Sequence, residues 1–131
     1  MFVDASAWTA ILLREPEREA FIAKLADANS VATSALAGWE TVRAVARTTG
    51  KGLAEAGQLL DALQRSVDVR IVKIGESEQA VAVDAYARFG KGRHPAKLNM
   101  GDCFAYACAK TNGVPLLYKG DDFALTDIAP A

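Results

Sequence analysis

The chain has 131 residues, about half of them apolar, and a formal net charge of −1. This length fits one domain with a real hydrophobic core, expected to cover residues 1–131. The near-neutral charge excludes a global basic field that attracts nucleic acid, so any phosphate-binding site must be basic locally. No apolar run approaches the ~20 residues that a membrane-spanning helix needs.

Short apolar runs alternate with helical patterns along the whole chain. Apolar residues at three- and four-residue spacing indicate helices, and short runs bounded by turn residues indicate strands. In chain order we expect a strand at 1–4, helices at 7–13 and 16–28, a strand at 31–33, helices at 34–49 and 53–67, a strand at 69–74, helices at 76–89 and 102–111, a strand at 115–118 and a short last strand at 128–129. This alternation is typical of a parallel sheet with helices on both faces.

The thiol and imidazole groups offer little for metal or acid–base chemistry. Cys103 and Cys108 are five residues apart on one predicted helix, so they point about 140° apart at ~100° per residue. We expect both to be small buried residues of a reduced, cytoplasmic protein. His94 is the only histidine, which argues against chemistry based on His.

The stretch 91–110 begins as a basic loop containing Gly and Pro and ends as an alanine-rich helix, with Asp102 at the junction. Asp is a preferred N-cap and interacts well with the positive end of a helix dipole, and this alone would account for it. The alternative is that other carboxylates converge on Asp102.

Four more carboxylates follow predicted strands or lie in the helices after them. Asp4 closes the first strand, and Glu40 lies two turns into the helix that begins near residue 34. Asp121 and Asp122 follow a later strand. In open α/β sheets, ligands bind in the crevice at the carboxyl ends of the strands, so these groups can meet there.

Each carboxylate also has a purely structural explanation. Asp4 can cap the first helix, Glu40 can be a solvated helix residue, and Gly-Asp-Asp suits a turn. Carboxylates that do meet repel one another, and a hard divalent cation removes that cost. Because all the candidate ligands are oxygens, the expected ion is Mg²⁺ or Mn²⁺.

These residues match a known family. The segments 2–7, 91–103 and 116–123, together with Glu40, resemble the PIN-domain ribonucleases, and most closely the VapC-like toxins of bacterial toxin–antitoxin pairs. The resemblance spans almost the whole chain, and the segment Leu-Asn-Met-Gly-Asp-Cys that ends at Cys103 is its most specific part. It implies a three-layer α/β/α sandwich with a mainly parallel sheet of four to five strands.

The resemblance also implies an activity and a site. It implies a Mg²⁺- or Mn²⁺-dependent endoribonuclease that leaves a 5′-phosphate and a 3′-hydroxyl, with Asp4, Glu40 and Asp102 as its acids and metal ligands. Ser6 is expected to hold a water or a carboxylate by a hydrogen bond.

The fourth acid departs from the family pattern. Gly120 stands where the family often carries Asp, so the resemblance offers Asp122, or its neighbour Asp121, as the fourth acid. A VapB-like antitoxin and a homodimer are the implied partners.

Local positive charge is expected to bind RNA phosphates. Lys91, Arg93 and Lys97 precede Asp102, and Arg43 follows Glu40 by one helical turn. The alternatives are that Arg93 or Arg43 pairs with the acidic cluster, or that Arg43 lies on a solvated face.

The two tryptophans are the remaining side chains that could contact RNA bases. Trp8 and Trp39 lie on apolar helical faces. We therefore expect them to make core or dimer contacts rather than to stack on bases.

One rival function is a catalytically weak PIN-fold module that binds RNA or a partner. The other is a phosphoacceptor that uses strand-end acids, Mg²⁺ and Lys119.

Overall fold

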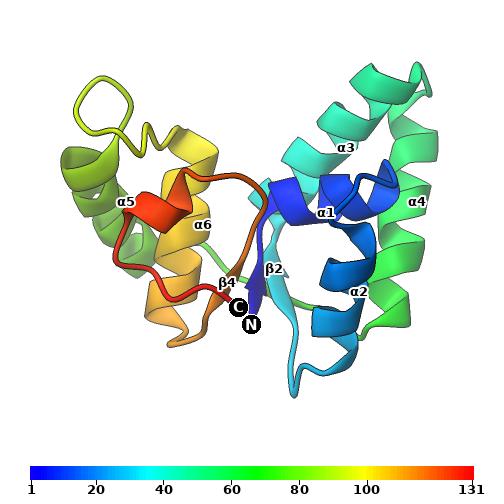
Figure 1. The fold of residues 1–131 in the computed structure, drawn as a ribbon, viewed down its shortest axis with the longest axis horizontal. Helices are drawn as coiled ribbons and strands as arrows, with labels where there is room; N and C mark the ends of the chain where they lie inside the picture. Colours follow the sequence, from blue (N-terminus) through cyan, green and yellow to red (C-terminus); the bar gives the residue numbers. More distant parts are fainter.

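The computed structural model describes all residues 1–131 and shows a four-stranded sheet between two layers of helices (Figure 1). The elements in chain order are β1 (Phe2–Val3), α1 (Ala5–Leu12), α2 (Arg18–Ala26), β2 (Ala32–Ser34), α3 (Ala35–Thr49), α4 (Leu53–Ser66), β3 (Arg70–Val72), α5 (Glu76–Phe89), α6 (Met100–Thr111), β4 (Leu116–Leu117) and a 3₁₀ turn, η1 (Phe123–Leu125).

All strand pairs are parallel, and the strand order is β3-β2-β1-β4. Helices α1 to α4 lie on one side of the sheet, and α5 and α6 lie on the other (Figure 1). This confirms the predicted three-layer α/β/α sandwich. No helix combines the length and apolar character needed to cross a membrane.

Two apolar clusters hold the layers together. One lies between the sheet and the α5–α6 pair and includes Leu98, Tyr106 and Leu116. The other packs around Trp8, which is fully buried and whose Nε1 donates a hydrogen bond to Thr33 Oγ1 at 3.1 Å. Trp8 is therefore a core residue, as the sequence indicated, and it ties α1 to the neighbouring strand.

Side-chain caps and glycine fix the ends of α3. Its N-cap Ser34 accepts a hydrogen bond from Ala37 N at 3.1 Å, which satisfies a backbone donor of the first turn. Gly50 ends α3 with φ 73°, a left-handed conformation that favours glycine. These bounds agree with the predicted helix at 34–49.

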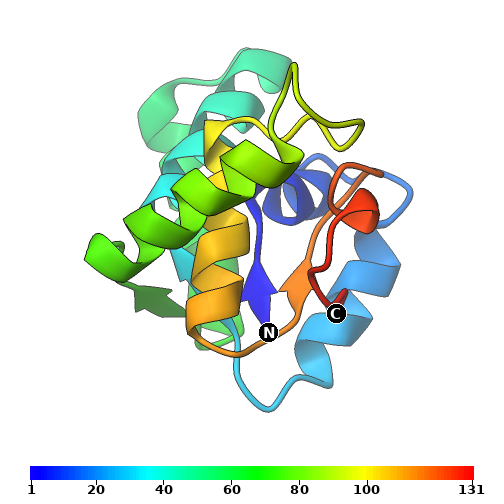
Figure 2. The ribbon, with the colours of Figure 1, turned by 90° about the vertical axis from the view of Figure 1, so that its left-hand side faces the viewer.

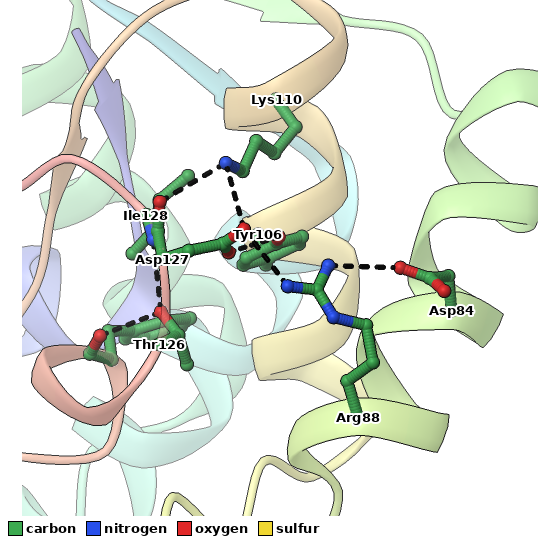
Figure 3. A network of polar contacts seen from close by, with 8 residues as sticks. Asp84, Arg88, Tyr106, Lys110, Thr126, Asp127 and Ile128 are labelled. Carbon is green, nitrogen blue, oxygen red and sulfur yellow. Dashed lines mark hydrogen bonds and ion pairs between the residues drawn. The ribbon is translucent and has the colours of Figure 1, made fainter.

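The C-terminal segment is held by a polar network rather than by a strand (Figure 3). Tyr106 in α6 donates to Asp127 Oδ1 at 2.6 Å, and Arg88 in α5 pairs with Asp127 Oδ2 at 3.0 Å. The predicted strand at 128–129 is wrong, because this segment makes only an isolated bridge to Leu116.

Candidate active site

Asp4 lies at the carboxyl end of β1, in the middle of the sheet. Its side chain is 4% exposed and caps α1, because Oδ2 accepts hydrogen bonds from Ser6 N at 2.9 Å and Ser6 Oγ at 2.6 Å. Burial raises the pKa of the Asp4 carboxyl, and the bonds from Ser6 oppose that rise. Asp4 therefore caps α1 and also stands at the strand end where the site was expected, so the two predicted roles do not exclude each other.

Glu40 lies in the second turn of α3, and its carboxylate rests against the first turn of α6. A β-carbon added at Gly101 would lie 2.6 Å from Glu40 Cδ, so any other residue there would force the Glu40 carboxylate to move. Burial, followed by the charges of Asp4 and Asp102, raises the pKa of Glu40 to about 7, and Arg43 acts in the opposite direction. Glu40 is thus part of an acidic group and not a solvated helix residue.

Asp102 is the third residue of α6, and it is not the N-cap that its sequence position allowed. The N-cap is Asn99, whose Oδ1 accepts from Asp102 N at 3.1 Å, while Asp102 Oδ2 accepts from Asn99 N at 2.8 Å. This reciprocal pair is a capping box, so the helix begins at Met100 instead of residue 102. Burial raises the pKa of Asp102 to about 6; the bond from Asn99 lowers it, and Asp4 and Asp122 raise it.

These three acids line one pocket of about 460 Å³ at the carboxyl edge of the sheet. The pocket wall also contains Ser6 and Lys119, whose backbone N donates to Ser6 Oγ at 3.0 Å. Ser6 Oγ therefore accepts a hydrogen bond from the backbone that follows β4 and donates a hydrogen bond to Asp4. This chain of hydrogen bonds fixes the orientation of the buried carboxylate.

The donor set suits a hard divalent cation. The hydrogen bonds to Asp4 and Asp102 all go to Oδ2, so each Oδ1 remains available as a ligand. Burial first, and then the neighbouring acid charges, raise the pKa values of Glu40 and Asp102, and a bound cation would offset both effects. No three of the His, Cys, Asp and Glu side chains already surround a common metal position.

Asp121 and Asp122 lie outside this pocket, and both are exposed. Gly120 turns the chain before them with φ 98°, and Asp122 then begins η1. The charge of Asp122 contributes to the raised pKa of Asp102, whereas Asp121 is not among the causes. Of the two candidates for the fourth acid, Asp122 is therefore the one that acts on Asp102.

None of the four basic residues predicted to bind RNA lines the acidic pocket itself. Arg43 lines an adjoining pocket with Glu40 and Asn99, and its guanidinium lies 4.6 Å from the centre of the Trp39 ring. Trp39 is 54% exposed, so of the two predicted positions, core or dimer contact, the core is wrong and the dimer contact stays a prediction. Lys91 and Arg93 lie on the loop between α5 and α6, as does the exposed Lys97; none of them forms a salt bridge, and the alternative pairing of Arg93 with the acids is not seen.

Two positions of the site were not singled out from the sequence. Gly101 provides the space for Glu40, and Glu15 lines the acidic pocket beside Lys119. Lys119 Nζ pairs with Glu15 at 2.8 Å and with Glu17 at 3.1 Å, which leaves it no free charge for a phosphoryl group. Asn followed three residues later by Asp was the available signal for the capping box around Gly101.

Comparison with known proteins gives one consistent result. The PIN domain profile matches residues 1–129. A VapC ribonuclease of Rhizobium meliloti is 42% identical over 97% of this chain and 98% of its own length, and a ribonuclease VapC of Mycolicibacterium smegmatis is 42% identical over 98% of each. The crystal structure of Mycobacterium tuberculosis VapC20, described as a Sarcin-Ricin loop cleaving toxin, has a TM-score of 0.79 at 20% identity and covers 99% of this chain and 97% of that one. The chain therefore belongs to the PIN domain family, and within it to the VapC ribonucleases.

Proposed function

We propose that this protein is a Mg²⁺- or Mn²⁺-dependent endoribonuclease, folded as one domain over residues 1–131, that acts as the toxin of a toxin–antitoxin pair. The observation that carries the proposal is the convergence of Asp4, Glu40 and Asp102 on one pocket at the carboxyl edge of the sheet. Its near-full-length relatives are named ribonucleases, which supports RNA as the substrate.

Each acid has a proposed part in phosphodiester hydrolysis. Asp4 and Asp102 would hold the cation, and Glu40 and Asp122 would complete the acidic group around it. A divalent cation bound there polarises the phosphoryl oxygen and makes water a better nucleophile. Glu40, which lines the same pocket as Asp4 and Asp102, is placed to orient the attacking water and to take its proton. The P–O3′ bond then breaks, the departing 3′-oxygen takes a proton from solvent water, and the products are a 3′-hydroxyl and a 5′-phosphate.

The surrounding cations are proposed to hold the substrate. Arg43 adjoins the acidic pocket directly, and Lys91, Arg93 and Lys97 come from the loop that leads to Asp102. Contacts from these residues to phosphates would make RNA binding weaken as salt rises. Ser6 has a supporting part, because it orients Asp4 without reaching the substrate itself.

The proposed partners are a VapB-like antitoxin and a second copy of the chain, in the cytoplasm. A basic side chain of the antitoxin would be attracted by the three acids and would block the pocket. Exposed apolar side chains away from the pocket, such as Leu59, Ile71 and Ile74, provide surface for protein contacts.

The deciding experiment is cleavage of total RNA by the purified protein, with and without Mg²⁺ or Mn²⁺, beside the Asp102→Asn variant. Asp61→Asn, on an exposed acid of α4, serves as the matched control. We expect metal-dependent cuts with 5′-phosphate ends from the wild type and the control, and none from Asp102→Asn. If all three proteins are inactive but bind RNA equally, the protein is a binding module instead.

A further inference from the structure

Lys119 joins the segment that follows β4 to the turn between α1 and α2. Its Nζ lies 2.8 Å from Glu15 Oε2 and 3.1 Å from Glu17 Oε2. The side chains of Lys119, Glu15 and Glu17 are 33%, 31% and 38% exposed, so this double ion pair is partly shielded from solvent. In Figure 2 the segment (orange to red) and the turn (blue) lie next to each other. We call Lys119, Glu15 and Glu17 the lysine clamp.

The turn that carries both glutamates is held rigidly. Arg14 lies in the left-handed region with φ 56°, a conformation that a non-glycine residue keeps only where the surrounding structure determines it. Pro16 stands between the two glutamates, and its ring fixes φ there. Glu15 N donates a hydrogen bond to Ala10 O at 2.9 Å, which ties the turn to α1. The two carboxylates therefore offer the ammonium group a fixed position.

The segment held by the clamp is linked to two acids of the site. Lys119 N donates to Ser6 Oγ at 3.0 Å, and Ser6 Oγ donates to Asp4 Oδ2 at 2.6 Å. Three residues after Lys119, Asp122 begins η1, and its negative charge contributes to the raised pKa of Asp102. The position of Lys119 therefore bears on two of the three acids that line the pocket.

The hydrophobic core fixes the other end of this segment. Phe123 is 3% exposed, and its ring packs against Tyr118 with 5.0 Å between the ring centres. Between the two ends, Gly120 has φ 98°, and Asp121 and Asp122 are both exposed. The core thus anchors the C-terminal end of the 119–123 segment, and the clamp anchors its N-terminal end.

The charges of the clamp favour positioning over substrate binding. One ammonium meets two carboxylates, so the clamp brings no net positive charge to the acidic pocket. A lysine that served by charge alone would not need two such partners. Because its four-carbon stem is flexible, two partners on one turn are what hold the side chain in a single direction.

We infer that Lys119 is a positioning residue of the acidic site. Its ion pairs with the α1–α2 turn fix the segment that follows β4, and this segment presents Asp122 toward Asp102 and orients Ser6. The inference rests on the proposed function as a metal-dependent ribonuclease. It adds that the affinity for the cation depends on a side chain that is not itself a ligand.

The affinity for Mn²⁺ separates positioning from charge, because the two effects have opposite signs. Lys119→Met removes a positive charge beside the acids, so electrostatics alone would tighten the binding of a cation. Loss of position would weaken it, because ligands that are no longer oriented bind a metal less well. The dissociation constant of Mn²⁺ is measured without RNA, from the electron paramagnetic resonance signal of the free ion. Lys51→Met, which breaks the exposed pair with Glu55, is the matched control for the lost charge.

We expect Lys119→Met to weaken Mn²⁺ binding about tenfold, as the loss of a group that orients metal ligands does. Lys51→Met should leave the dissociation constant unchanged. In the Asp122→Asn background, where the positioned acid is already lost, Lys119→Met should lose most of its effect. Equal or higher affinity in Lys119→Met would overturn the inference, and so would an equal fold-change in both backgrounds.

Glu15→Gln combined with Glu17→Gln breaks the clamp from its other end and leaves Lys119 in place. This variant repeats the comparison if circular dichroism shows that Lys119→Met does not fold. Its effect should also be smaller in the Asp122→Asn background, and an equal effect in both backgrounds would overturn the inference. A wild type that binds no Mn²⁺ would instead defeat the proposed metal-dependent function.

Discussion

The carboxylate of Glu40 lies directly against the backbone of Gly101, and this contact joins α3 to the first turn of α6. A β-carbon at position 101 would lie 2.6 Å from Glu40 Cδ and closer still to both carboxylate oxygens. The contact places Glu40 beside Asp102 and within reach of its charge. The glycine before the aspartate is therefore a requirement of the acidic pocket and not of the helix.

Gly101→Ala is expected to lower the cleavage rate at least tenfold, because Glu40 must leave its position. Gly57→Ala in α4 is the matched control, since an added β-carbon there meets nothing within 4 Å. Ala in place of a helical Gly should raise the free energy of unfolding by about 1 kcal/mol at position 57. Cleavage kinetics and urea unfolding of both variants measure the two effects. An active Gly101→Ala protein would show that Glu40 need not lie at this helix.

Ser6→Ala is expected to act on Asp4 through lost hydrogen bonds. Ser6 Oγ donates to Asp4 Oδ2 and accepts from Lys119 N, so its removal leaves a backbone N–H without this partner. We expect a loss of about 1–2 kcal/mol in the free energy of unfolding. The pKa of Asp4 should rise further, because the Ser6 side chain lowers it, so the rising limb of the pH–rate profile should move to higher pH. Ser6→Thr, which keeps the hydroxyl, should restore both the stability and the pH–rate profile. If the profile of Ser6→Ala is not shifted, Ser6 stabilises the fold without affecting the ionisation of Asp4.

Lys119 neutralises two glutamates beside the acidic pocket. Lys119→Met should lower the free energy of unfolding, because Glu15 and Glu17 lose their shared cation. It should also weaken RNA binding, since two unpaired negative charges then flank the site. Lys51→Met breaks an exposed pair with Glu55 and serves as the control, with an expected change under about 0.5 kcal/mol. Equal RNA affinity of Lys119→Met and wild type would exclude this electrostatic effect.

The general architecture was predictable from the sequence, for physical reasons that are local. Alternating helical and strand patterns indicate a parallel sheet, and the caps Asp4 and Ser34 are residue types that begin helices. The strand order was not predictable, because it depends on contacts between segments far apart in the chain. Trp39 shows the limit of pattern reading: its helical face looks apolar, yet no neighbouring element covers it.

The site was predictable as a set of acids but not as a geometry. The sequence placed Asp102 at a helix start without showing that Asn99 is the cap. Nor does any local pattern show that the space above Gly101 is filled by Glu40, sixty-one residues earlier in the chain. Such contacts follow from how α3 and α6 pack, which no single segment encodes.

The acidic pocket should make the metal-free protein less stable as pH rises. The pKa of Glu40 is raised from 4.5 to about 7, so the folded protein binds this proton more tightly than the unfolded chain does. The free energy of unfolding therefore falls between about pH 4.5 and about pH 7. Thermal unfolding in EDTA should show Glu40→Gln gaining a few degrees, about 3 °C, over wild type near pH 7.5 and nothing near pH 4. Asp61→Asn should show no such pH-dependent gain; if Glu40→Gln shows none either, neither burial nor the neighbouring acids raise the pKa of Glu40 in the folded protein.

Asp127 should have the opposite dependence on pH, far from the active site. Its pKa is lowered to about 2, first by the hydrogen bond from Tyr106 and then by that from Arg88. The folded state therefore favours the ionised form, and this stability is complete above about pH 4 and is lost as pH falls toward 2. Asp127→Asn keeps an acceptor for Tyr106 but removes the charge, and because the side chain is half exposed we expect a loss of only about 1 kcal/mol at pH 7.

The control is Asp84→Asn, which breaks the exposed pair of the same Arg88 within α5 and should cost under about 0.5 kcal/mol. Urea unfolding from pH 7 to pH 2 measures the difference between wild type and each variant. The Asp127→Asn difference should shrink toward zero at the acidic end, while RNA cleavage at pH 7 stays unchanged. A difference that is constant with pH would assign the effect to packing of the C-terminal segment, because only a charge that titrates can make it vanish.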